Sequence, residues 1–95
     1  MLTSKQRAAL KAMANGIDAI FQVGKGGVND ALIVHVDDAL RTRELIKLRV
    51  LETSPESAAD IAKTLAAATG SEVVQVIGFR FVLFRANPED GKIKI

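Results

Sequence analysis

The stretch that decides the fold runs from Ala19 to Leu51 and reads AIFQVGKGGVNDALIVHVDDALRTRELIKLRVL. Residues Ala19–Val23 form a short run of strand-forming side chains, which predicts a β-strand. Apolar side chains then recur at helical spacing over Asn29–Leu40, and Leu45–Leu51 alternates between apolar and basic residues as a strand does. A strand, a helix and a strand in this order predict parallel neighbours joined by a right-handed crossover.

The two periodicities also predict which side chains of this unit are buried. The apolar stripe of the helix comprises Leu32, Ile33, Val36, Ala39 and Leu40. In the second strand Ile46, Leu48 and Val50 point one way. Lys47 and Arg49 point the other way, so one face of this strand is basic.

An N-terminal helix is predicted ahead of this unit. Thr3 or Ser4 caps it, with Gln6 in the capping-box position after Thr3. Asn15 and Gly16 are residues that end helices, so we expect the helix to stop there.

A third helix is predicted after the second strand. Ser54 offers a capping hydroxyl and Pro55 suits the first helical position, so we expect the helix to begin there and to end at Gly70. Its apolar stripe comprises Ala58, Ile61, Ala62, Leu65 and Ala68.

Two more strands are predicted at Val73–Ile77 and Phe79–Arg85, joined by a tight turn or bulge at Gly78 that favours antiparallel pairing. The third helix and the strand after it predict a second pair of parallel neighbours. The whole chain, residues 1–95, is then one α/β (α+β) domain with three helices and a mixed four-stranded sheet. Residues 87–95 are expected to form a frayed tail.

The amino-acid composition limits the classes of protein to which this chain can belong. The chain has 95 residues, of which 48% are apolar and 25% charged, as is ordinary for one globular domain. It has no cysteine, which excludes disulfides and favours the cytoplasm. One histidine and no tyrosine leave few groups for nucleophile-base chemistry, so we expect no enzyme, cofactor or metal. No stretch approaches the roughly 20 apolar residues of a membrane span, and we expect a monomer without a membrane partner.

Charge alternates along the chain, although the net charge is only +2. The basic segments are 1–17, 41–51 and 73–95, and the acidic segments are 18–40 and 52–72. This alternation favours one positive and one negative surface, but a mixed solvated surface explains it equally well. Within the first segment, Arg7 and Lys11 stand one helical turn apart, and we expect both to face outward.

The loop Gly24-Lys25-Gly26-Gly27 joins the first strand of the unit to its helix. Glycines let backbone N–H groups approach an anion, and the helix N-terminus adds positive potential. The loop fits neither the G-x-x-x-x-G-K-[ST] pattern of nucleotide phosphate loops nor the G-x-G-x-x-G pattern of dinucleotide sites. It fits G-x-x-G, the spacing by which KH-type domains clamp a nucleic-acid backbone. A plain strand-to-helix turn is the alternative.

Four runs resemble the CRM domain, namely Val23–Ala31 (VGKGGVNDA), Ala39–Arg49 (ALRTRELIKLR), Val74–Gly78 (VQVIG) and Val82–Arg85 (VLFR). They follow in the order and spacing of that family, and the resemblance covers nearly the whole chain. The runs ELIK and VQVIG are more specific than the glycine loop. More narrowly, the chain resembles the bacterial stand-alone YhbY-type RNA-binding proteins.

The resemblance implies a KH-like fold similar to the C-terminal domain of translation initiation factor 3, and RNA binding through the GxxG loop and nearby basic residues. The site positions that it implies are Gly24, Lys25, Gly26, Gly27, Lys5, Lys47 and Arg85. We extend this positive track with Arg7 and Lys11. At Phe79 the chain departs from the basic residue that is usual in the family. Arg80 follows, but neighbouring strand residues face opposite ways, so it stays outside the predicted site.

The resemblance therefore implies a non-enzymatic RNA-binding protein that acts in assembly of the large ribosomal subunit, with ribosomal RNA as its partner. Phosphate contacts are expected to dominate, because four phenylalanines and no tyrosine or tryptophan offer little for base stacking. The alternative is a protein-interaction module that docks a ribosomal protein or GTPase through its sheet face or second helix, with a merely structural glycine loop.

Overall fold

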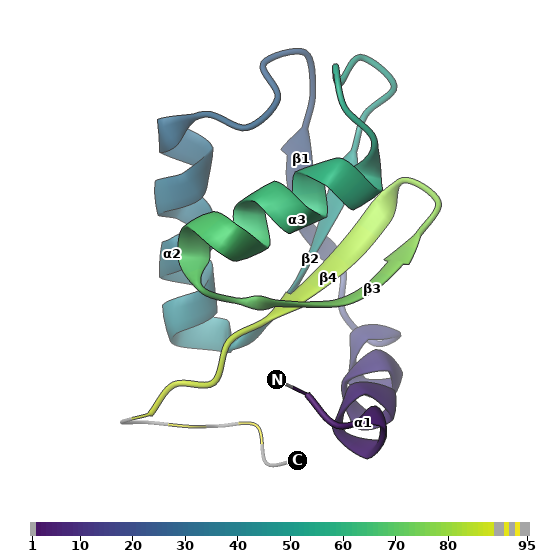
Figure 1. Cartoon of the computed structure of the whole chain (residues 1–95), viewed down its shortest axis with the longest axis vertical. Coiled ribbons are helices and arrows are strands. Elements are labelled where there is room, and N and C mark those ends of the chain that lie inside the picture. Colours follow the sequence, from purple (N-terminus) through teal and green to yellow (C-terminus); the bar gives the residue numbers. More distant parts are fainter. Residues whose placement is uncertain (1, 89–90, 92, 94–95) are drawn as a thin grey trace.

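The structure is a computed structural model that describes residues 2–88, 91 and 93. The elements are α1 (Ser4–Ala14), β1 (Ala19–Val23), α2 (Asp30–Arg43), β2 (Leu45–Val50), α3 (Ala58–Thr69), β3 (Glu72–Ile77) and β4 (Arg80–Phe84) (Figure 1). This order confirms the predicted three helices and four strands. No helix in the described ranges is both long and apolar enough to span a bilayer.

The four strands form one mixed sheet in the order β1-β2-β4-β3. β1 and β2 are parallel, as the crossover predicted, and β4 is antiparallel to both of its neighbours. The expected second pair of parallel neighbours is wrong, because β4 lies between β2 and β3. The chain reverses at Gly78, which has a φ of +57°, so that β4 runs back between β2 and β3. In this position β4 forms a hydrogen-bonded ladder with each of them, and not with β3 alone.

The two faces of the sheet are covered to different extents. α2 and α3 pack on one face and bury the main core, which includes Leu48 and Phe81 (Figure 1). α1 packs on the other face at one end only, where Leu10 meets Val82 and Phe84. The rest of this second face, which we call the open face, carries Lys47, Arg49, Gln75, Ile77 and Arg80.

α1 begins at a predicted cap, and α2 begins within one residue of its predicted start. The hydroxyl of Thr3 accepts from the N–H of Gln6 at 3.1 Å while the Gln6 side chain accepts from the N–H of Thr3, which completes the capping box. Asn29 caps α2. α2 continues past its predicted end to Arg43. The prediction followed the apolar stripe, which ends at Leu40, and so it missed the polar last turn.

α3 begins at Ala58 and not at the predicted Ser54. The capping residue is Ser57, whose hydroxyl accepts from the N–H of Asp60 at 3.2 Å. Ser54 instead accepts from the N–H of Glu56 and donates to the carbonyl of the same residue, at 3.3 and 2.9 Å. The proline motif thus forms a turn ahead of the helix, because a serine hydroxyl satisfies nearby backbone groups equally well outside a helix.

The far end of α3 confirms the predicted stop at Gly70, which adopts the left-handed conformation with a φ of +67°. The buried stripe differs at one position, since Thr69 is buried and the predicted Ala68 is exposed. Thr69 tolerates burial because its hydroxyl donates to the carbonyl of Leu65 at 2.7 Å.

Ser57→Ala is expected to destabilise the fold by about 1 kcal/mol, because it removes the cap from the N–H of Asp60. In a domain of this length such a change lowers Tm by about 4–8 °C. Ser54→Ala, which removes only the local turn bonds, is the matched control and should lower Tm less. Thermal unfolding followed by circular dichroism compares the two variants. A larger loss of Tm in Ser54→Ala than in Ser57→Ala would show that Ser54, and not Ser57, caps α3.

Candidate nucleic-acid interface

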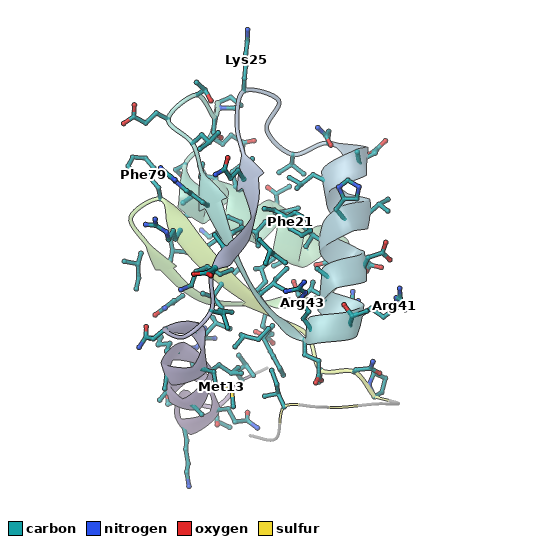
Figure 2. The ribbon with its side chains drawn as sticks, turned by 180° about the vertical axis from the view of Figure 1, so that it is seen from behind. Met13, Phe21, Lys25, Arg41, Arg43 and Phe79 are labelled. Atoms are coloured by element: carbon teal, nitrogen blue, oxygen red, sulfur yellow. The ribbon has the colours of Figure 1, made fainter. Side chains whose placement is uncertain are left out.

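The glycine loop is a tight turn between β1 and α2. The N–H of Gly27 donates to the carbonyl of Gly24 at 2.9 Å, which places Lys25 and Gly26 at the tip. Both tip residues are exposed, and Lys25 projects from one end of the molecule (Figure 2). Within the described residues the ammonium of Lys25 has no ion pair, so its charge is available to a ligand.

Two glycines of the loop lie close against the segment after β2. A Cβ on Gly24 would lie 3.3 Å from Cδ1 of Leu51, and a Cβ on Gly27 would lie 3.3 Å from Cγ of Pro55. Gly27 also has a φ of +58°, which side chains rarely adopt. Gly26 has neither constraint. Its lack of a Cβ leaves the tip open to a ligand.

A hollow of about 290 Å³ borders this loop, β1 and the start of α2. Phe21, Leu32 and His35 are among the residues that line it. The rings of Phe21 and His35 are stacked with their centroids 6.1 Å apart, and Phe21 lies between β1 and α2 (Figure 2). The N-terminus of α2 therefore borders a hollow whose lining contains both aromatic and polar side chains.

Lys47 lies on the open face, as its alternation in β2 predicted. β2 and β4 pair so that Lys47 lies opposite Val82 and Arg49 opposite Arg80, and directly opposed residues share a face. Within the described chain none of these three cations has a hydrogen bond or ion pair from its side chain. Sequence reasoning left Arg49 and Arg80 out of the site. Alternation in β2 contained the signal for Arg49, but the position of Arg80 depends on strand register.

Arg7 does not face outward as predicted. Its guanidinium donates to the carbonyl oxygens of Val73 and Val74, at 2.5 and 2.9 Å. These carbonyls lie where the pairing of β3 with β4 shifts register between Val73 and Gln75. The arginine satisfies carbonyls at this irregularity and ties α1 to β3, because a bulge leaves part of a ladder unpaired. Its prediction as an RNA contact stays untested.

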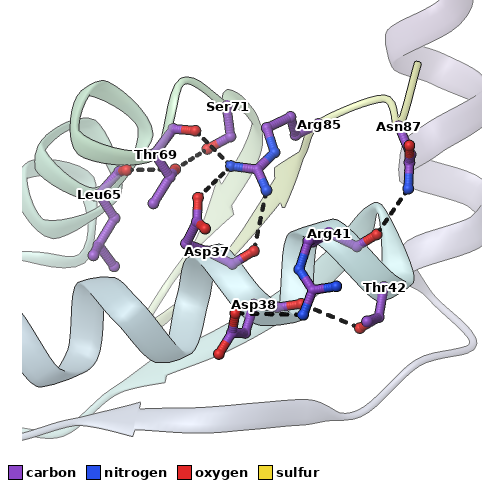
Figure 3. Close-up of polar contacts among 9 residues, drawn as sticks. All are labelled: Asp37, Asp38, Arg41, Thr42, Leu65, Thr69, Ser71, Arg85 and Asn87. Atoms are coloured by element: carbon purple, nitrogen blue, oxygen red, sulfur yellow. Dashed lines mark hydrogen bonds and ion pairs between the residues drawn. The ribbon is translucent and has the colours of Figure 1, made fainter. Parts of the chain in front are cut away.

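Arg85 is half-buried in a network that joins three elements (Figure 3). One guanidinium nitrogen donates to the Asp37 carboxylate at 2.6 Å and to the Thr69 carbonyl at 2.8 Å, and the other donates to the Asp37 carbonyl at 3.1 Å. The side chain therefore fastens the end of β4 to α2 and to the C-terminus of α3, where a cation is favourable. The structure thus places Arg85 on the side of the helices, away from Lys47.

Lys5 and Lys11 remain exposed on α1. α1 and Lys25 lie at opposite ends of the molecule (Figure 2), whose longest extent is 35 Å. The predicted positive track is therefore not one cluster. Its two ends are the loop and α1, and Lys47 and Arg49 on β2 lie between them.

Comparison with known proteins gives consistent matches along the chain. The CRS1/YhbY (CRM) domain family matches residues 2–85. "Probable RNA-binding protein YqeI" of Bacillus subtilis is 43% identical over 95 residues, which cover 100% of this chain and 99% of that protein. A Haemophilus influenzae protein named "RNA-binding protein" is 30% identical and covers 99% of this chain and 94% of its own length. The solution structure of the hypothetical protein SAV1595 from Staphylococcus aureus has a TM-score of 0.83 and 46% identity, and covers 100% of this chain and 99% of its own.

Proposed function

This chain belongs to the CRS1/YhbY (CRM) domain family, and from that premise we propose that it binds RNA through its glycine loop and open face. Relatives that are named RNA-binding proteins support RNA as the ligand. The observation that carries the proposal is the exposed Lys25 on a turn whose glycines lie next to the N-terminus of α2.

The loop would hold a phosphate of the RNA backbone. Gly26 presents no Cβ, so the backbone approaches the ligand closely, and Lys25 supplies a full positive charge. Lys47, Arg49 and Arg80 would continue this attraction along the open face toward Lys5 and Lys11. Arg7 and Arg85 would act indirectly, by holding α1 and the end of β4 in place. Contacts of this kind position a backbone without reading its sequence.

We infer further that the RNA is ribosomal and that the protein is a non-enzymatic, cytoplasmic assembly factor of the large subunit. Its likeness to YhbY-type proteins, carried by the ELIK and VQVIG runs, supports this inference. A surface dominated by backbone contacts also suits a large RNA that is recognised by its shape.

Lys25→Ala is expected to weaken binding to a structured fragment of large-subunit ribosomal RNA several-fold. It should also reduce the slope of log K against log salt concentration by about one, because one phosphate contact is lost. Lys63→Ala, an exposed cation on α3 in the opposite layer, is the matched control. Gel-shift titrations at several salt concentrations measure both quantities.

Two outcomes would count against this proposal. If Lys25→Ala keeps both the affinity and the salt slope of the wild type, the loop is not part of the site. If the wild type binds no RNA at all, the protein-docking alternative is favoured.

A further inference from the structure

The open face contains a second, smaller hollow. Its volume is about 120 Å³, and it is lined by Asn15, Lys47, Gln75, Ile77, Arg80 and Val82. Asn15 follows α1, and the other lining residues come from β2, β3 and β4. Segments far apart in the sequence therefore build it together. No Asp or Glu is among the described residues that line it.

The polar side chains of this hollow form no hydrogen bond or ion pair with other described residues. Lys47 and Arg80 bring positive charge, and the carboxamides of Asn15 and Gln75 bring both donors and acceptors. In the part of the chain that the structure describes, none of these four side chains forms a hydrogen bond or ion pair. The hollow thus offers hydrogen-bonding groups of both kinds to an external ligand.

The remaining wall is apolar. Val82 is almost fully buried, and Ile77 is 63% exposed beside the β3–β4 turn. Apolar side chains next to a few polar groups are typical of small-ligand sites, because the ring of a ligand packs on the former while its edge bonds to the latter. Carboxamides are also the side chains that pair with two edge atoms of a base at once.

We propose that this hollow binds one unstacked nucleobase of a single-stranded RNA segment. The base packs on the exposed side chain of Ile77, and its polar edge meets the carboxamides of Asn15 and Gln75. Lys47 and Arg80 hold the flanking phosphates. This inference rests on the proposed RNA-binding function, and it specifies that the open face binds RNA in single-stranded form.

The composition of the hollow favours a base over simpler ligands. A phosphate alone would use the two cations and leave the apolar wall and the carboxamides unmatched. An acidic side chain would match the charge and accept from the carboxamides, but it has no ring to pack on Ile77. In a duplex the bases are stacked and paired, so they are not free to enter. A single strand supplies the charge, the ring and the edge together.

Gln75→Ala is expected to weaken binding of short single-stranded RNA about fivefold, since a net hydrogen bond is worth about a factor of five. The salt slope should not change, whereas Lys47→Ala should reduce it by about one. The probes are labelled homopolymers of A, C or U and a duplex of equal length, measured by fluorescence anisotropy with Lys63→Ala as the control. The wild type should prefer a single strand to the duplex.

A second measurement reports the site directly. On addition of the homopolymers, the side-chain amide NMR signals of Gln75 and Asn15 should shift. Those of Asn87, whose side-chain amide donates to the Arg41 carbonyl on the side of the helices, should stay in place.

The outcomes separate this inference from the proposed loop function. Unmoved amide signals, with wild-type affinity in Gln75→Ala, would overturn the base site even if Lys25→Ala weakens binding. Suppose instead that the amide signals shift, that Gln75→Ala binds RNA more weakly and that Lys25→Ala binds as tightly as the wild type. That result would support the base site and show that the glycine loop does not contact the RNA. Equal affinity for single strand and duplex would also overturn the inference.

Discussion

Replacing Gly26 by aspartate should lower the affinity for RNA by at least about tenfold while the fold stays intact. The new carboxylate would stand at the tip of the loop, next to the phosphate that the loop is proposed to hold. Two unit charges about 4 Å apart repel by about 1 kcal/mol in bulk water and about 4 kcal/mol near a protein surface. A loss of about 1.4 kcal/mol already corresponds to a factor of ten.

The backbone accepts this change, so the effect on binding can be read directly. Gly26 is not in the left-handed region, and a Cβ there has the side chain of Asn29 at 3.7 Å as its nearest neighbour, which is ordinary contact. Gly27 would be a poor choice, because a side chain there meets Pro55 and an unfavourable φ at once.

Gly26→Asn is the matched control, because asparagine has the shape of aspartate without its charge. We expect Gly26→Asn to keep most of the wild-type affinity, and the difference between the two variants to shrink as salt screens the charges. Anisotropy titrations at low and high salt measure it. Equal affinities for the aspartate and asparagine variants would contradict a phosphate at this loop.

Glu44→Ala should destabilise the fold by about 2–3 kcal/mol, or roughly 10–20 °C in Tm. Glu44 is 1% exposed at the end of α2, and its carboxylate accepts from the backbone N–H groups of Asn87 at 2.7 Å and Ile93 at 2.9 Å. Without the carboxylate, these two backbone N–H groups lose a buried, charged hydrogen-bond acceptor, which lowers the free energy of unfolding. Because alanine would keep the positive φ of 65° at this position, the comparison reports the loss of the side chain and not of backbone strain.

Glu52→Ala, at an exposed glutamate after β2, is the control and should change stability by less than about 0.5 kcal/mol. Hydrogen exchange gives a local readout. The amides of Asn87 and Ile93 should exchange slowly in the wild type and faster in Glu44→Ala. Fast exchange of both amides in the wild type, with an unchanged Tm in the variant, would show that Glu44 does not anchor this segment.

The contacts of Glu44 also bear on the predicted frayed tail, residues 87–95. Asn87 and Ile93 are held by the carboxylate, and Ile93 packs against the smaller core beneath α1. Residues 89, 90, 92, 94 and 95 lie outside the described part of the chain.

Much of the fold was predictable, because it depends on short-range patterns. A short run of strand-forming residues located the strand Ala19–Val23 at its observed bounds. The capping residue Thr3 located the start of α1, and apolar spacing located the start of α2 to within one residue. The start of α3 was wrong because Ser54 and Ser57 are both suitable caps, and local chemistry does not rank them. The neighbours of β4 were wrong because strand pairing joins residues that are distant in the sequence.

The same division holds for the candidate site. The sequence by itself determined the turn of the glycine loop, the exposure of Lys25 and the basic face of β2, because each depends on residues a few positions apart. Only the tertiary structure decided that Arg7 and Arg85 bond within the fold, and that Arg80 joins Arg49 and Lys47 beside a hollow. A cation looks the same in a sequence whether it meets a carbonyl of its own chain or solvent, and packing alone makes that choice.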